Sequence, residues 1–232
     1  MAFKLGKIND QTEQGRLGLS FAQAAFTDYL AARVLLNEGL LLQGATLAST
    51  AVEKYLKLML GARWLKTNKH LDSIDLDVVL ATGAHPAGVR RDFLDLMGLV
   101  YKTRYLDSLP SIITFCLEGP KVLAELDFTV SVLVSNFDLI ADGVPMTSPY
   151  QSAKDNNHPH LFKNNYVLQN SDKATAVAAP GAASAYWINQ QASVIECRSN
   201  PPNWNANDQS SFTRAGFTKN ADGTYLAVAF DL

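Results

Sequence analysis

Residues 20–64 decide the fold of this chain and read SFAQAAFTDYLAARVLLNEGLLLQGATLASTAVEKYLKLMLGARW. Apolar side chains recur in this stretch every three or four residues, the spacing that places them on one face of an α-helix. They form two stripes, the first made of Phe21, Ala25, Tyr29, Ala32 and Leu36 and the second of Leu47, Ala51, Tyr55, Leu58 and Ala62. Because residues 39–44 connect the stripes closely, we expect two antiparallel helices packed against each other in a bundle.

Two further long helices are predicted downstream. The first covers about 89–106, with the apolar stripe Phe93, Leu96, Met97, Val100 and Tyr101. The second covers about 120–141, with the stripe Val122, Leu126, Val130, Leu133, Phe137 and Ile140. A short helix is expected near 73–81. Together they predict an up-and-down helical bundle over residues 18–141, after an N-terminal arm of residues 1–17.

The character of the sequence changes after residue 141. Residues 142–161 are rich in Pro, Ser, Asn and His without an apolar period, which is typical of a linker. Strand-length apolar runs follow at 166–168, 193–197 and 224–230, and the pair Asp222-Gly223 favours a hairpin turn. We therefore expect a small antiparallel β module over residues 162–232, and an α+β fold for the whole chain.

Composition limits the environment and the partners. The 232 residues are 47% apolar, enough for a buried core, and the formal net charge of −2 gives no overall attraction for long nucleic acid. The two cysteines, Cys116 and Cys197, are far apart and make no disulfide framework. The N-terminal residues lack the apolar segment of a signal peptide, and no apolar run is long enough to cross a bilayer. We expect a cytoplasmic protein without a membrane partner.

Four segments in the bundle resemble the HEPN domain family of bacterial and archaeal helical proteins. They are DYLAAR at 28–33, AVEKYLK at 51–57, KHL at 69–71 and YKTRYLD at 101–107. The last is similar to the Arg-Tyr-Pro-Asp segment of many members, with Leu106 in place of the proline. The resemblance covers residues 18–141 and implies a helical bundle that forms a homodimer.

Catalytic members of that family are metal-independent ribonucleases that use an Arg and a His separated by four to six residues. The Arg stabilises phosphate charge while the His moves a proton. Arg104 stands at the expected place, but no His follows it within reach. Arg63 and His70 have the required spacing, but they lie at the end of the second predicted helix rather than in the later one. These three residues are the candidates if the protein is an enzyme.

The family resemblance also implies a binding cleft between the helices, although solvated helix surface is the simpler interpretation of each cation taken alone. By resemblance, Tyr29, Arg33, Lys54, Lys57 and Arg104 would border one cleft, and Tyr105 beside Arg104 would stack a base while the guanidinium binds phosphate. Each cation also has a simpler interpretation. Lys57 and Glu53 have the spacing of a helix-surface ion pair, and Arg104 would tie its helix end to Asp28 or Asp107.

Three functions follow from these patterns. The leading hypothesis is a noncatalytic HEPN-like module that binds a nucleotide, RNA or a protein partner. The resemblance implies a nucleotidyltransferase-like partner in a toxin–antitoxin or defence system. The second is the ribonuclease, and the third is a ligand or peptide surface on the β module, lined by Tyr186, Trp187 and Trp204, with the bundle as an oligomerisation platform. The pair His158 and His160 has no third ligand nearby in sequence, so no metal or cofactor is predicted.

Overall fold

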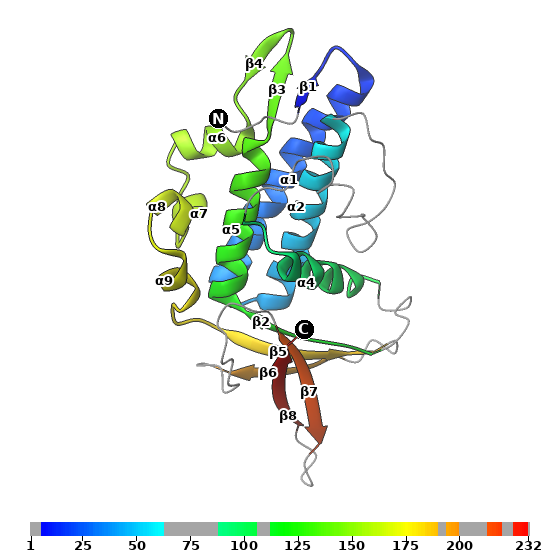
Figure 1. The fold of residues 1–232 in the computed structure, drawn as a ribbon, viewed down its shortest axis with the longest axis vertical. Coiled ribbons are helices and arrows are strands. Elements are labelled where there is room, and N and C mark those ends of the chain that lie inside the picture. The colour runs from blue at the N-terminus through cyan, green and yellow to red at the C-terminus, as the bar shows by residue number, and fades with distance from the viewer. Residues whose placement is uncertain are drawn as a thin grey trace.

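A computed structural model describes residues 6–62, 88–105, 112–189, 194–199, 213–219 and 225–231. It shows long helices near the N-terminus and small sheets at both ends of them (Figure 1), which confirms the predicted α+β class. The expected short helix at 73–81 and the candidates Arg63 and His70 lie outside the described residues. No helix among the described residues is long and apolar enough to cross a membrane.

The first two helices match the two apolar stripes. Helix α1 spans Glu13–Asn37 and α2 spans Leu41–Ala62. The side chain of Thr12 caps α1 by accepting a hydrogen bond from the backbone N–H of Gly15 at 3.0 Å. Gly39 supplies the positive φ of 74° that the tight turn between the helices requires. The expected helix pair is confirmed, and α1 starts earlier than the predicted bundle boundary.

Helices α4 (Arg91–Lys102) and α5 (Gly119–Ser135) complete the bundle. Helix α5 is shorter than predicted because Phe137–Ala141 form strand β3, in which Phe137 and Leu139 alternate inward. Strand β3 pairs in parallel with β1 (Gly6–Asn9) and antiparallel with β4 (Val144–Met146). The N-terminal residues thus contribute a strand as well as the first turns of α1.

A second sheet lies at the opposite end of the bundle (Figure 1). Its strands, in the order β2-β5-β6, are Ile113–Glu118, Ala183–Ile188 and Val194–Ser199, all antiparallel. Strands β7 (Thr213–Lys219) and β8 (Tyr225–Asp231) form an antiparallel hairpin. The strand expected at 193–197 and the expected hairpin are confirmed. Strand β2 leads directly into α5, so the sheet is joined to the bundle.

Four short helices run along α1 and α5 between the two sheets (Figure 1): α6 (Pro149–Asp155), α7 (Pro159–Phe162), α8 (Tyr166–Gln169) and α9 (Lys173–Val177). Residues 142–161, for which the sequence predicts a linker, include α6 and α7 and bury Tyr150 and Leu161. The strand predicted at 166–168 is wrong. The Asn165 side chain accepts from the backbone N–H of Leu168 and begins a helical turn there.

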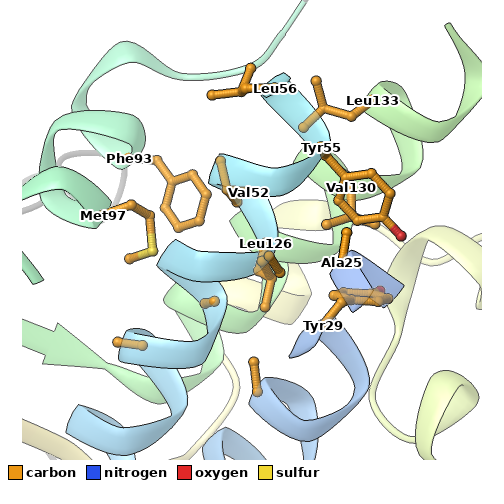
Figure 2. Packing of buried hydrophobic residues seen from close by; sticks show 14 of the residues in the cluster. Ala25, Tyr29, Val52, Tyr55, Leu56, Phe93, Met97, Leu126, Val130 and Leu133 are labelled. Carbon is orange, nitrogen blue, oxygen red and sulfur yellow. The ribbon is translucent and has the colours of Figure 1, made fainter. Parts of the chain in front are cut away.

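One core connects these parts. Figure 2 shows Phe93 and Met97 of α4 beside Val52 of α2, and all three side chains are fully buried. The same cluster continues into the β2-β5-β6 sheet, where the rings of Phe115 and Tyr186 have centroids 5.4 Å apart. The bundle and the sheet therefore exclude water together.

Candidate functional site

A buried ion pair joins α1 to α5. The guanidinium of Arg33 bonds to the carboxylate of Asp127, and both side chains have no exposed surface. Arg33 also donates from Nε to the backbone carbonyl of His160 at 2.9 Å, and from a terminal nitrogen to the carbonyl of Lys163. Because these carbonyls lie at α7 and just after it, Arg33 fixes the C-terminal segment against the bundle.

Tyrosine and asparagine side chains complete this buried cluster, which we define as Tyr29, Arg33, Asp127 and Asn165. The hydroxyl of Tyr29 donates to Asp127 Oδ1 at 2.7 Å. Asn165 donates from Nδ2 to the Leu161 carbonyl at 3.0 Å, and lies 3.4 Å from the Tyr29 oxygen. Tyr29 and Arg33 therefore lie in the interior rather than at an open cleft.

Burial sets the ionisation of these groups. Burial raises the pKa of Asp127. The nearby Arg33 guanidinium lowers that pKa, but by less than burial raises it, so the pKa stays above its usual value. Burial alone would lower the pKa of Arg33, but the Asp127 carboxylate raises it above its usual value. Burial and the same carboxylate raise the pKa of Tyr29 well above its usual value. Tyr29 therefore stays a hydrogen-bond donor throughout the physiological pH range.

Tyr150 of α6 packs beside the buried cluster, with its ring centroid 6.1 Å from that of Tyr29. Its hydroxyl is buried and has no hydrogen-bond partner within the described ranges.

Tyr29 and Tyr150 thus allow a matched comparison of a bonded and an unbonded buried hydroxyl. Tyr29→Phe should lower the free energy of unfolding by about 1.5–3 kcal/mol, because it removes a bond to a charged group. Tyr150→Phe should leave it unchanged or raise it. Urea unfolding measures both, and equal losses would contradict this interpretation.

Six buried tyrosines among the described residues predict a loss of stability in alkali. Burial raises the pKa values of Tyr101 and Tyr150 to about 12, and also raises those of Tyr29, Tyr55, Tyr166 and Tyr186. An unfolded tyrosine loses its proton near pH 10, so this stabilisation is complete below pH 10 and is lost as the pH rises toward and beyond 12. The expected slope is about 1.4 kcal/mol per pH unit for each buried tyrosine. Urea unfolding at pH 8 to 11 tests it, and an unchanged free energy above pH 10 would contradict it.

A second polar group lies on the surface formed by α2 and the end of α4. Arg104 donates from Nη1 to Thr50 Oγ1 at 3.1 Å. Its guanidinium carbon lies 5.1 Å from the centroid of the Tyr101 ring and 5.7 Å from that of Tyr105. Tyr101 is buried, whereas Tyr105 keeps 47% of its surface exposed. An arginine and an exposed aromatic ring are therefore held together in contact with solvent.

Lys57 belongs to the same surface. Its Nζ lies 2.6 Å from Glu53 Oε1, one turn earlier on α2. Thr50, Glu53 and Lys57 are spaced three and four residues apart on α2, so they share one side of that helix. Burial, and after it the Glu53 carboxylate, raise the pKa of Tyr101 to about 12. We call Thr50, Lys57, Arg104 and Tyr105 the α2–α4 face.

The structure thus divides the six predicted binding residues into three groups. Lys57, Arg104 and Tyr105 lie on the α2–α4 face, and Tyr29 and Arg33 lie in the buried cluster. Lys54 bonds to Asp28 at 2.6 Å and bridges α2 to α1. Asp28, one of the two partners expected for Arg104, is therefore paired with Lys54, while Asp107 lies outside the described residues.

Asp127 is the important residue that sequence reasoning did not select. Its signal was available, because a carboxylate next to Leu126 and three residues before Val130 stands among the core positions of α5. Glu125 gives a similar signal. It is 2% exposed and pairs with Lys173 at 2.8 Å.

The predicted ligand surface of the β module is placed only in part. Tyr186 is 2% exposed and donates its hydroxyl to Glu196 at 2.8 Å, so it packs in the core. Trp187 is half-buried, and Trp204 lies outside the described residues. Across the described ranges, no three His, Cys, Asp or Glu side chains are grouped so as to hold a metal ion.

The fold and these two polar groups define a mixed α+β protein with a buried ionic cluster and an exposed arginine–tyrosine face. Comparison with protein-family models, curated proteins and solved structures found no match to the chain.

Proposed function

We propose that the chain is a noncatalytic HEPN-like module that binds single-stranded RNA or a nucleotide on its α2–α4 face. The observation that carries this proposal is Arg104, which is exposed and stacked against Tyr101 and Tyr105. An arginine binds phosphate oxygens through several N–H groups at once, and an exposed tyrosine ring stacks a base. Lys57 adds a second cation to the same surface.

The absence of catalysis is part of the proposal. Within the described part of the chain, the side chains in contact with Arg104 are Thr50, Tyr101 and Tyr105, which supply no imidazole. Arg33 is fully buried and bonded to Asp127 and to two carbonyls, so its guanidinium is not presented to a substrate. The family resemblance further supports a homodimer and a nucleotidyltransferase-like protein partner.

Charge sets the strength expected of this binding. The net charge of −2 gives no general attraction, so Arg104 and Lys57 must supply the phosphate contacts locally. Two such contacts to a single strand predict a slope of about −1.4 for log affinity against log salt concentration. Stacking on Tyr105 adds about 1–3 kcal/mol. We therefore expect weak binding with a shallow salt dependence.

Replacing Arg104 with glutamine tests the proposal. A fluorescein-labelled ten-nucleotide oligouridylate, followed by anisotropy at low salt, should bind the wild-type chain and bind R104Q about tenfold less tightly, since a charge-assisted contact is lost. Tyr105→Ala should weaken binding by a comparable factor. Arg91→Gln is the matched control, because Arg91 is an exposed arginine at the start of α4, the helix that Arg104 follows, and is paired with Asp95 at 3.5 Å.

Two results would contradict the proposal. One is wild-type binding that R104Q and Y105A leave unchanged, which would place RNA elsewhere on the molecule. The other is the absence of wild-type binding to both the oligonucleotide and ATP. The same samples, run on a denaturing gel, test the alternative function. Cleavage that His70→Ala abolishes would establish the ribonuclease and overturn the noncatalytic assignment.

A further inference from the structure

A pocket of about 330 Å³ lies between α5, α6 and α8. Its walls carry both polar and apolar side chains, including Ser131, Val134, Ser148, Lys154, Val167 and Leu168. Its volume is near the lower end of the range for small-molecule sites, about 300–1,000 Å³. None of its lining residues belongs to the α2–α4 face.

Hydrogen-bond donors that the protein does not use face this pocket. Within the described part of the chain, the Lys154 ammonium has no ion-pair partner, although it lies on the same helix as Asp155. Asp155 instead accepts from Gln151 Nε2 at 2.6 Å. Ser148 Oγ accepts from the backbone N–H of Gln151 at 3.1 Å, which leaves its own proton to donate. A ligand group that accepts hydrogen bonds and carries negative charge fits these two donors.

Tyr150 forms part of the inner wall of the pocket. It is 6% exposed, and its buried hydroxyl has no partner among the described residues. Because that hydroxyl is buried beside Tyr29, it is not one of the donors that the pocket offers to a ligand. The pocket donors are therefore those of Lys154 and Ser148, and Tyr150 contributes to the pocket only through the rest of its side chain and its backbone.

Charge and shape narrow the ligand class. One ammonium balances one negative charge, whereas a nucleotide or a polyphosphate would leave further charges uncompensated. Val134, Val167 and Leu168 form an apolar wall that suits a short hydrocarbon body. We propose that the α5–α6–α8 pocket binds a small monocarboxylic acid, with its carboxylate at Lys154 and Ser148 and its apolar part against that wall.

Titration of the ¹⁵N-labelled full chain with 3-methylbutanoate and benzoate, followed by NMR, tests this site. The neutral isostere 3-methylbutanamide serves as the matched ligand. At least one acid should shift the backbone amides of residues 131–135, 148–154 and 167–170, and bind about tenfold more tightly than the amide. Lys154→Gln should weaken acid binding about tenfold, and Lys102→Gln, in α4, should not change it. Lys154 is exposed, so K154Q should keep the wild-type fold, which its spectrum reports directly.

Several outcomes would overturn the inference. They are no shift with either acid at 10 mM, equal affinity for acid and amide, or unchanged binding in K154Q. Inorganic phosphate that binds as tightly as the acids would show an anion site without the apolar specificity, and would overturn the carboxylic-acid assignment. The RNA proposal is tested at Arg104 and Tyr105, which do not line this pocket. A negative result with the acids is therefore distinguishable from a negative result with oligouridylate.

Discussion

Replacing Asp127 with alanine is expected to lower the free energy of unfolding by about 3–5 kcal/mol. The substitution leaves the Arg33 guanidinium charged and fully buried, opposite a cavity instead of a carboxylate. It also removes the acceptor of the Tyr29 hydroxyl. Since whole domains are stable by only about 5–15 kcal/mol, this loss is a large fraction of the total. Urea unfolding followed by circular dichroism measures it.

Two variants make that measurement specific. Asp28→Ala breaks the ion pair with Lys54, in which the Lys54 side chain is 25% exposed and the Asp28 side chain 21% exposed. It should lower the free energy of unfolding by only about 0.2–1 kcal/mol. The double variant R33M/D127L removes both buried charges and should recover part of the loss. Recovery should be incomplete, because the carbonyls of His160 and Lys163 then lose their donor. A D127A variant within about 1 kcal/mol of the wild type would show that the buried Arg33–Asp127 pair contributes little to stability, and would contradict this prediction.

Phe115→Ala is expected to be comparably destabilising, by about 3–5 kcal/mol. Phe115 lies in β2, is fully buried, and packs on Tyr186 of β5. Its removal leaves a cavity where the sheet meets the bundle. Because the two parts share one core, the helical signal and the tryptophan fluorescence should be lost in the same urea transition, shifted to a lower concentration.

Ile112→Ala is the matched control, because Ile112 immediately precedes β2 and is 55% exposed. It should change the free energy of unfolding by no more than about 0.5 kcal/mol. Separate transitions for helix and fluorescence, with only the second one moved by F115A, would mean that the sheet unfolds independently of the bundle.

The sequence predicts well those elements whose signal is local. The stripes around Tyr29 and Tyr55 follow the helical period over many turns, and the hairpin β7–β8 is indicated by Asp222-Gly223. The sequence does not predict strand β2, because the pairing of this strand is distant, with Cys116 opposite Ala185. It predicts a strand where α8 lies, because three apolar residues do not distinguish the helical period from the strand period, and the decisive signal is the Asn165 cap.

The candidate site shows the same division between local and distant information. Helical spacing indicates which residues of α2 share a side, so Lys57 and Glu53 were expected to pair, and they do. The spacing does not say which neighbour each side meets. Tyr29 and Arg33 were therefore grouped with Arg104, although α1 directs them toward Asp127 of α5. Only the packing of α5 and α7 against α1 separates the buried arginine from the exposed one.

The most direct test of the RNA proposal is to map where single-stranded RNA touches the ¹⁵N-labelled full chain by NMR. Titration with oligouridylate should shift the amides around Thr50, Lys57 and 101–105, and leave those of residues 131–135 and 148–154 unchanged. That result would place the ligand on the α2–α4 face. Shifts confined to other elements, or no shifts at millimolar oligonucleotide, would contradict the proposed function.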